Sequence, residues 1–391
     1  MRKLITLFVL SLLLVIGLPN LPQALSQSSL GEIRGVWITK NDSDIWLDSN
    51  ILNSKIQELA QLNFNTIYPV VWNSGYVSYD SAVAKRLGIQ DFVRKGLQNQ
   101  DIIADIVEKG HENGLLVIPW FEFGFMTPPT SELAMKHPKW LTTRLDGSKT
   151  GDSAAGQVVW LNPFHPQVQK FITDLVVEVC RKYKVDGIQF DDHLALPKDF
   201  GYDSYTVNLY KQEMKKNPPG NPQDADWMKW RADKITEFVE RLHSKVKQIN
   251  PNFIFSVAPN PYHTAYNSFL QDWKTWVNKG IVDELIIQVY RDDLNSFVNE
   301  LKKPELQNAR KKISSGVAIL TGLRNNPTPI NFIEDKVKKA KQYGLGVSFF
   351  YYETLLQEKV DESTEMRKSS IKALFYAPKS RFRHEVKVSV F

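Results

Sequence analysis

Apolar and polar residues alternate along this chain in short runs that predict β-strands, and longer apolar stripes between them predict amphipathic helices. Eight runs of strand length recur through most of the sequence. They span residues 32–39, 64–72, 115–124, 186–193, 253–260, 284–290, 313–320 and 346–353. Helical segments alternate with these runs, and the clearest span residues 50–62, 166–184, 227–249 and 330–343.

Alternation of this kind predicts a parallel sheet, and eight units predict that the sheet closes. We therefore expect an α/β fold, a (β/α)8 TIM-type barrel, in a single domain over residues 27–376. An open doubly wound sheet is the alternative, but no glycine-rich phosphate loop follows the first strand. Two long insertions, 125–160 and 197–226, follow the third and fourth strands, and the first looks irregular. Loops of this length are often lids or binding loops, here at the carboxyl ends of the strands.

The two ends of the chain differ from the middle. Arg2 and Lys3 precede an apolar run over residues 4–18, and small residues follow, which is the pattern of a signal peptide at residues 1–26. We expect a secreted or periplasmic protein with no stable membrane insertion after cleavage; an uncleaved anchor is the alternative. Residues 377–391 form a basic tail for which the pattern predicts no place in the barrel.

Charge and cysteine content narrow the class of partner. The net charge of +6 is spread thinly, and no motif or groove-reading element accompanies it, so we expect no nucleic-acid partner. Lys311 and Lys312 are predicted to lie on a solvated surface, and a weak attraction to anionic envelope polymers stays open. Cys180 is the single cysteine, which excludes an internal disulfide.

The stretch from Asp186 to His193 carries the most chemistry. Ile188 and Phe190 alternate with Gln189 and Asp191, so the apolar pair is predicted to face the helices and the polar pair the barrel interior. Asp191 would then stand at the carboxyl end of the strand, where α/β barrels place their active sites. Capping of the next loop by an aspartate is the alternative reading.

The same alternation predicts which residues of the other strands line one cup at the barrel mouth. These positions are Trp37, Thr39, Tyr68, Trp72, Trp120, Glu122, Gln189, Asp191, Ser256, Asn260, Gln288, Tyr290, Tyr351 and Glu353. Aromatic rings, amides and carboxylates without a central basic residue suit a sugar, because rings stack on its apolar faces and carboxylates and amides bond its hydroxyls. We therefore expect a carbohydrate polymer or oligosaccharide as partner. The predicted binding residues are Trp37, Trp72, Trp120, Gln189, His193, Asn260, Gln288, Tyr290 and Tyr351.

Glycoside hydrolysis requires two carboxyl groups that face the scissile bond. Strands three and four are neighbours, so Asp191 is the predicted nucleophile or base and Glu122 the predicted proton donor. Asp192 and Glu353 are the reserve candidates for either role. A carboxyl separation of about 5–5.5 Å would indicate retention of configuration, and about 6.5–9.5 Å inversion.

Metal-dependent chemistry is the main rival. Asp191, Asp192 and His193 are metal-ligand types, but consecutive strand residues are expected to diverge, and no His-x-x-x-His pair is present. We predict no metal and no cofactor. A serine-nucleophile elbow, Gly-x-Ser-x-Gly, does not occur either.

Several strand-end motifs resemble one known family. Gly35-Val-Trp-Ile-Thr39, Pro119-Trp-Phe-Glu-Phe-Gly124, Trp160-Leu-Asn-Pro163, Asp186-Gly-Ile-Gln-Phe-Asp-Asp-His193 and Gly346-Val-Ser-Phe-Phe-Tyr-Tyr-Glu353 are similar to bacterial glycosyl-hydrolase-like family 10. This resemblance covers residues 32–375 and implies a TIM-type barrel, with a bacterial cell-envelope or extracellular polysaccharide as substrate. The pattern around Asp191 also resembles the nucleophile strand of the α-amylase clan, but the fifth strand lacks the carboxylate that this clan places after it. A glycan-binding barrel without activity and a metal-dependent hydrolase or deacetylase are the two alternatives.

Overall fold

The computed structural model describes residues 31–40, 45–46, 48–87, 101–153, 156–323 and 326–382. The predicted signal peptide, residues 1–26, lies outside the described residues, as do residues 383–391 of the basic tail. Within the described part, no helix combines the length and the apolar character needed to cross a membrane.

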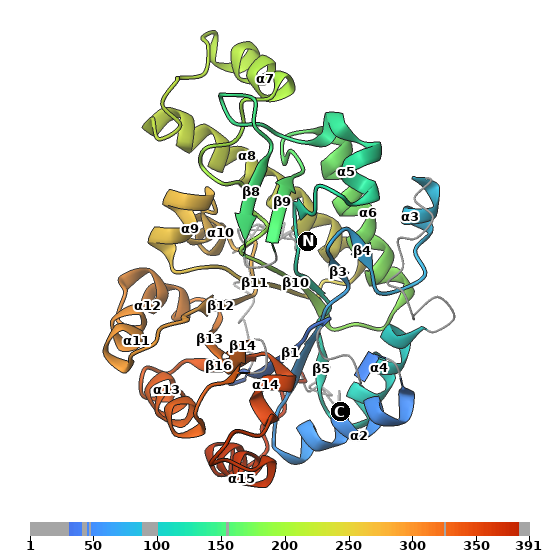
Figure 1. The fold of residues 1–391 in the computed structure, drawn as a ribbon, viewed down its shortest axis with the longest axis vertical. Coiled ribbons are helices and arrows are strands. Elements are labelled where there is room, and N and C mark those ends of the chain that lie inside the picture. The colour runs from blue at the N-terminus through green and yellow to red at the C-terminus, as the bar shows by residue number, and fades with distance from the viewer. Residues whose placement is uncertain are drawn as a thin grey trace, which may run out of the picture.

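A parallel sheet of nine strands curls around the centre of the molecule, and helices cover its outer face (Figure 1). The strands lie in the order β5-β2-β1-β16-β13-β12-β11-β10-β6. Their bounds are β1 Arg34–Ile38, β2 Thr66–Pro69, β5 Leu116–Val117, β6 Trp120–Phe121, β10 Gly187–Asp191, β11 Ile254–Ala258, β12 Glu284–Gln288, β13 Ser314–Leu320 and β16 Gly346–Phe350.

The two edge strands, β5 and β6, are successive parts of the third predicted strand. β5 pairs with β2 and β6 pairs with β10. Between them, the amide of Ile118 donates to the carbonyl of Ile67 at 3.0 Å, and the carbonyl of Pro119 accepts from the amide of Gln189 at 2.8 Å. The sheet therefore closes on itself through this segment, and the predicted TIM-type barrel is confirmed.

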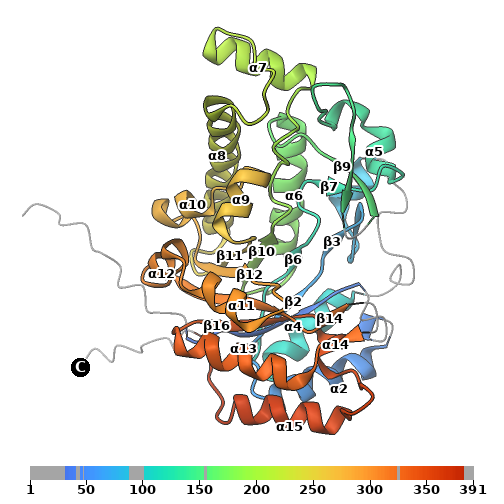
Figure 2. The same ribbon diagram turned by 60° about the vertical axis from the view of Figure 1, so that its left-hand side comes forward.

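The helices bury their apolar stripes against the outer face of the sheet, as the sequence pattern predicts. Seven of them begin with a side-chain cap, from Asp48, Asp101, His165, Asp224, Asp272, Asp293 or Ser363. α15 lies along α13 on the outside of the barrel (Figure 2). The outer helices are α2 Ser49–Gln61, α4 Ile102–Glu112, α6 Pro166–Lys182, α8 Ala225–Ile249, α9 Tyr262–Phe269, α10 Trp273–Lys279, α11 Leu294–Leu301, α12 Pro304–Arg310, α13 Ile330–Gln342, α14 Tyr352–Leu356 and α15 Thr364–Leu374.

The insertions carry regular structure of their own. The prediction of an irregular loop at residues 125–160 is therefore wrong. β7 pairs with β9 and β8 pairs with β9, all antiparallel. Asn162 donates to Asp203 at 2.9 Å and thereby ties this insertion to the next one. The inserted elements are β3 Trp72–Asn73, β4 Tyr76–Val77, α3 Ala82–Arg86, β7 Met126–Thr127, α5 Glu132–Lys136, the 3-10 turn Pro138–Trp140, β8 Thr150–Ser153, β9 Gly156–Trp160, α7 Ser204–Met214 and the short hairpin of β14 Gly322–Leu323 with β15 Asn326–Pro327.

The chain after α15 returns to the amino end of the barrel, where the sequence pattern offered no place for it. Arg381 forms an ion pair with Glu284 at the start of β12, and both side chains are fully buried. The same guanidinium donates to the hydroxyl of Thr66 at 2.8 Å. Glu284 also accepts hydrogen bonds from Tyr68 at 2.9 Å and Ser256 at 2.7 Å. The tail therefore supplies a charge that the barrel interior requires.

Candidate active site

Asp191 and Glu122 stand side by side at the carboxyl end of the barrel. β10 pairs with β6 up to the step Phe190↔Phe121, and the next step of this register brings Asp191 beside Glu122. The alternation that predicted both carboxyl groups at one mouth is therefore correct for these two strands.

A glycine makes the close approach of the two strand ends feasible. Gly124 has a φ of +45°, and a Cβ at this position would lie 2.4 Å from the carbonyl oxygen of His193. The amide of Phe125 donates to that same oxygen at 3.1 Å. Only a residue without a side chain fits this backbone, and it fixes the loop after β6 against the loop after β10.

His193 connects the two candidate acids. Its Nδ1 lies 2.9 Å from Asp191 Oδ1 and 2.8 Å from the backbone carbonyl oxygen of Glu122. A carbonyl oxygen can only accept, so Nδ1 carries the hydrogen. The backbone amide of His193 also donates to Asp191 Oδ1, at 2.9 Å.

Asp191 is held in place from every side. Trp120 Nε1 donates to its Oδ2 at 3.2 Å, and Gln271 Nε2 donates to its backbone carbonyl at 2.8 Å. Burial raises the pKa of Asp191 to about 6, although the charge of His193 opposes this rise. Burial alone would lower the pKa of His193, but the negative charges of Asp191 and Asp192 raise it to about 10. At neutral pH the pair is therefore a carboxylate and an imidazolium.

Glu122 has a different environment. Burial, and next the negative charge of Asp191, raise its pKa to about 7. Asn73 on the β3–β4 hairpin donates to Oε2 of Glu122. This carboxyl group is therefore partly protonated near neutrality, beside an aspartate that is mostly ionised, and this contrast is the one that separates a proton donor from a nucleophile or base.

Asp192 turns toward the other side of the mouth. It accepts from Asn260 Nδ2 at 2.9 Å and from Gln288 Nε2 at 2.9 Å. Burial and then the charges of Asp192, Asp191 and Glu122 hold the pKa of Tyr290 well above its usual value. These predicted substrate-binding residues therefore surround the acids, although their roles in binding stay predictions.

An aromatic layer lies beneath the acids. Trp37 Nε1 donates to Gln189 Oε1 at 2.6 Å inside the barrel. The ring of Phe350 lies 6.2 Å from Trp37, 6.1 Å from Trp120 and 5.9 Å from Tyr290. These rings therefore pack together at the carboxyl end of the barrel, and their part in lining a sugar-binding cup stays a prediction.

Two parts of the cup prediction are wrong. β16 ends at Phe350 and α14 follows, so Tyr351 and Glu353 do not continue the inward positions of the strand; Phe350 takes that place, Tyr351 is buried, and Glu353 lies in the first turn of α14. Trp72 is also misplaced, because it is fully buried with its ring 5.6 Å from Phe171 of α6.

The expected divergence of Asp191, Asp192 and His193 is wrong as well. One ligand-type atom from each residue lies within 4.8 Å of the others. The reason is that β10 ends at Asp191, so the two residues that follow no longer alternate. The Asp192 oxygens already accept from two amides, and His193 Nδ1 carries a hydrogen that it donates.

Sequence reasoning missed Asn73, Gln271 and Phe350. Asn73 and Gln271 lie on an insertion hairpin and just before α10, where no period predicts the direction of a side chain. Phe350 was missed because the inward set of this strand was assigned one residue out of step: Phe350 shares a face with Ser348, whereas Phe349 packs outside the strand against Phe64 and Phe375.

Comparison with known proteins agrees with this geometry. The family model described as Glycosyl hydrolase-like 10 matches residues 32–339. Glycosyl hydrolase DigH of Escherichia coli (strain K12) is 23% identical over 316 residues, which are 69% of this chain and 68% of DigH. Glycosyl hydrolase YngK of Bacillus subtilis (strain 168) is 22% identical over 322 residues, which are 74% of this chain and 60% of YngK.

Among solved structures, the PgaB (BpsB) glycoside hydrolase domain from Bordetella bronchiseptica aligns with a TM-score of 0.65 at 12% identity, over 87% of this chain and 99% of that domain. The catalytic domain of β-amylase from Paenibacillus polymyxa aligns with a TM-score of 0.59 at 11% identity, over 88% of this chain and 98% of that domain. These two likenesses show the barrel fold, and the family match covers most of the sequence. The chain belongs to the glycosyl hydrolase-like 10 family.

Proposed function

We propose that this protein hydrolyses glycosidic bonds in a bacterial cell-envelope or extracellular polysaccharide, and that it acts after export. The observation that carries the proposal is the pair of carboxyl groups where β6 and β10 end, whose pKa values are raised to about 7 for Glu122 and about 6 for Asp191. Buried acids with separate protonation states at a barrel mouth are typical of catalytic sites.

The roles follow from the hydrogen bonds. Asp191 receives three donors from His193 and Trp120, which favour its ionised form, so it is the nucleophile or the base that activates water. Among the described residues, Glu122 receives one side-chain donor, from Asn73, and its raised pKa suits a group that protonates the departing sugar oxygen. His193 does not touch the substrate in this scheme; it holds Asp191 and the Glu122 backbone in register.

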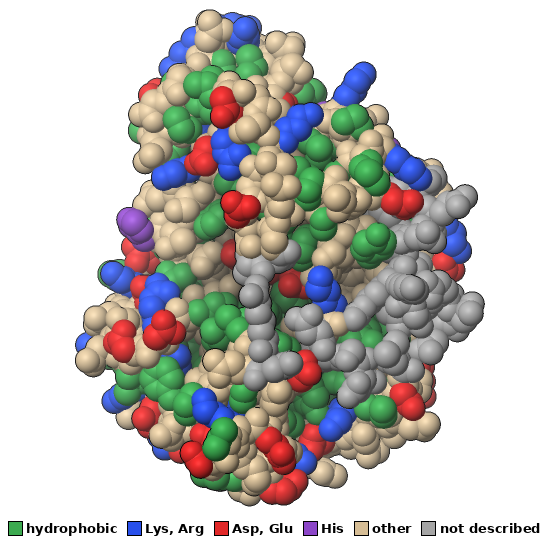
Figure 3. All heavy atoms as spheres, in the orientation of Figure 1, with side chains coloured by type: hydrophobic (Ala, Val, Ile, Leu, Met, Phe, Trp, Pro, Cys, Tyr) green, Lys and Arg blue, Asp and Glu red, His purple; other side chains and the backbone are tan. Residues whose placement is uncertain are grey.

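The substrate class rests on three supports. The residues around the acids are rings and amides, which bind sugars. The relatives DigH and YngK are named glycosyl hydrolases. On the face of the molecule shown in Figure 3, acidic and basic side chains are interspersed, without the basic stripe that a nucleic-acid-binding protein presents.

Replacement of one catalytic carboxyl group tests the proposal. Asp191→Asn should lower the rate of release of reducing ends from bacterial envelope glycans at least about a thousand-fold, because a neutral amide cannot act as nucleophile or base. The melting temperature should stay near that of the wild type. Asp226→Asn, a change of the same kind at a side chain that is 74% exposed, is the matched control. Full activity in Asp191→Asn would remove this mechanism.

The cluster of Asp191, Asp192 and His193 makes metal-dependent hydrolysis the second candidate function. A chelator separates the two: carboxylate catalysis is unaffected by it, whereas a metal enzyme loses activity and regains it when a divalent cation is restored. Binding of glycans by calorimetry without any turnover would instead favour a non-catalytic glycan-binding barrel.

A further inference from the structure

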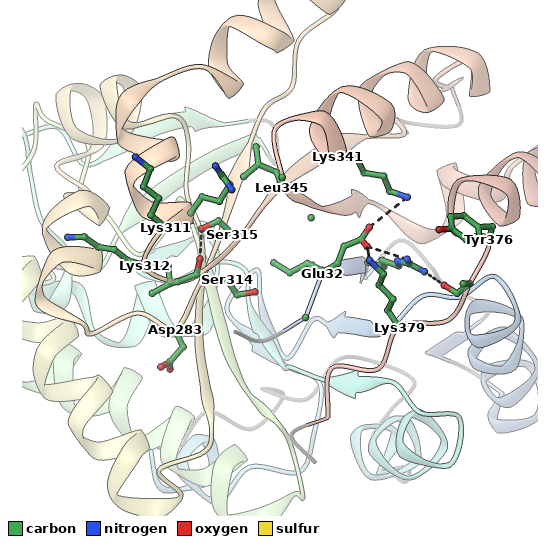
Figure 4. Close-up of a pocket in the computed structure, with 18 residues that line it drawn as sticks. Glu32, Asp283, Lys311, Lys312, Ser314, Ser315, Lys341, Leu345, Tyr376 and Lys379 are labelled. Carbon is green, nitrogen blue, oxygen red and sulfur yellow. Dashed lines mark hydrogen bonds and ion pairs between the residues drawn. The ribbon is translucent and has the colours of Figure 1, made fainter. Parts of the chain in front are cut away.

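A second cavity lies at the opposite end of the barrel from the candidate acids. Its volume is about 670 Å³. Its walls are formed by the segments that lead into β1, β12, β13 and β16, together with the chain after α15 (Figure 4). Because parallel strands begin at this end and the acids stand where strands finish, a molecule bound here leaves the barrel mouth open.

The cavity is strongly cationic. Its lining includes six basic and two acidic side chains. These are Arg34, Arg310, Lys311, Lys312, Lys341 and Lys379, with Glu32 and Asp283. The lining therefore has an excess of four positive charges, whereas the net charge of the whole chain is +6. Charge is therefore concentrated here, and a concave surface with one sign of charge attracts the opposite ion.

Both acids are already occupied. Glu32 pairs with Arg34 at 3.3 Å and with Lys379 at 2.7 Å, and Lys341 approaches it to 3.7 Å. Figure 4 shows Lys341 and Lys379 converging on Glu32 from one side of the cavity. Asp283 pairs with Lys247, outside the lining, at 2.7 Å. Neither acid is therefore available to neutralise the opposite wall.

That opposite wall carries three consecutive basic residues, Arg310, Lys311 and Lys312. Within the described residues, none of the three forms a salt bridge with a carboxylate. Arg310 donates to Gln307 and Lys312 to Asn278, both neutral amides, at 3.3 and 2.8 Å. Lys311 and Lys312 are exposed, as a solvated surface predicts, but they line a concavity.

The electrostatic effect extends to Lys341. Burial lowers the pKa of this amine; the charge of Glu32 opposes the decrease, and the smaller effects of Arg34 and Lys379 add to it. A bound anion would relieve the repulsion that Arg34 and Lys379 exert on Lys341.

We propose that this cavity binds the phosphate groups of an anionic polymer. Guanidinium and ammonium groups on two walls are the donors that phosphate oxygens accept from. A volume of about 670 Å³ is large for one phosphate and suits several repeat units. The protein would then hold an anionic polymer at one end of the barrel while the other end faces its glycan.

Binding of inorganic polyphosphate to the full chain tests this inference. Isothermal titration should show binding that weakens as salt rises, because each neutralised phosphate releases a counterion. Lys311→Glu/Lys312→Glu should weaken binding at least about tenfold, since two attractive charges become repulsive. Lys215→Glu/Lys216→Glu makes the same charge change at two consecutive exposed lysines after α7 and should leave binding within about twofold of the wild type.

Three results would overturn the inference. An equal loss in both double variants would mean that net charge, not this cavity, attracts the polymer. Equal affinity for poly-glutamate would refute the assignment to phosphate. A wild-type protein that does not bind polyphosphate would refute the site itself. All variants concern exposed side chains, so an unchanged melting temperature and unchanged glycan hydrolysis confirm that the barrel is intact.

Discussion

At the scale of single residues, the candidate site depends on one imidazole that affects two carboxyl groups unequally. His193 donates to Asp191 Oδ1 and lies 2.8 Å from the Glu122 carbonyl, so it contacts the carboxylate of one acid and only the backbone of the other. Positive charge is therefore delivered to Asp191 directly and to the Glu122 side chain only through space. This asymmetry accounts for a mostly ionised aspartate next to a glutamate that is partly protonated near neutrality.

The pH profile of hydrolysis follows from these two groups. Asp191 must be ionised, so activity should rise as pH rises through about 6. Glu122 must be protonated, so activity should fall as pH rises through about 7. A plot of kcat/KM against pH should be a narrow bell between these values, which are macroscopic constants of the coupled pair.

Glu122→Gln is the variant that checks the assignment. It should lower activity roughly a hundred- to ten-thousand-fold and abolish the alkaline limb, because the proton donor is gone. An aryl glycoside with an activated leaving group needs no proton donor. Glu122→Gln should therefore cleave such a substrate at a rate much closer to that of the wild type. Persistence of the alkaline limb in Glu122→Gln would assign that limb to another group.

Residue alternation found the acids but not their partners. Asp191, Glu122 and Gln189 could be placed because they occupy strands whose period is two. Asn73 and Gln271 could not, since loops and turns have no such period. Phe350 was missed because the inward and outward sets of its strand were assigned the wrong way round: Phe349, which has the parity of Tyr351, packs outside the strand against Phe64.

At the scale of elements, the eight strands and the helices between them were predictable because each repeats a strong local pattern. The insertion over residues 125–160 was not, since its strands are short and their pairing is decided by contacts between distant residues.

A second cavity near the candidate site lies between the outer helices α9, α10 and α12. A cavity of about 470 Å³ there is lined by Tyr262, Tyr266 and Trp273.

This aromatic cavity adjoins the mouth. Trp273 Nε1 donates to the backbone carbonyl of Asn260 at 3.1 Å, and the Asn260 side chain in turn donates to Asp192. The rings of Tyr262 and Tyr266 are 5.9 Å apart with an interplanar angle of 28°. Under the proposed function, we expect a glycan longer than a few units to contact these rings while its scissile bond lies at the acids.

Tyr266→Ala should raise KM for long glycan chains about tenfold, because it removes one ring on which a sugar stacks. It should leave kcat within about twofold and KM for the shortest cleaved oligosaccharide unchanged, because this ring lies away from the reacting bond. Steady-state kinetics on a ladder of chain lengths measures this. Tyr376→Ala, at a ring that is 85% exposed at the other end of the barrel, is the matched control. An equal effect of Tyr266→Ala on all chain lengths would contradict a role in binding distant sugar units.

At the scale of the whole molecule, the basic tail shows where local patterns stop being informative. Arg381 meets Glu284 across 97 positions of sequence, and neither residue has a neighbour in the chain that indicates the pairing. A single acidic residue in the apolar run of residues 284–290 was the available signal, since a charge inside a barrel requires a partner.

Residues 377–382 should therefore be part of the stable fold. Arg381→Ala leaves Glu284 as a fully buried charge without its cation, and should lower the free energy of unfolding by about 3–5 kcal/mol in urea titrations. The double variant Glu284→Gln/Arg381→Met removes both charges and keeps the bulk, so it should lose much less than Arg381→Ala, because a buried ion pair and a well-packed neutral pair differ little in free energy. Glu284→Gln alone would strand the guanidinium and should again be costly. If Arg381→Ala were as stable as the wild type, water or another cation would have to reach Glu284, and the tail would be an accessory to the barrel instead of a part of its interior.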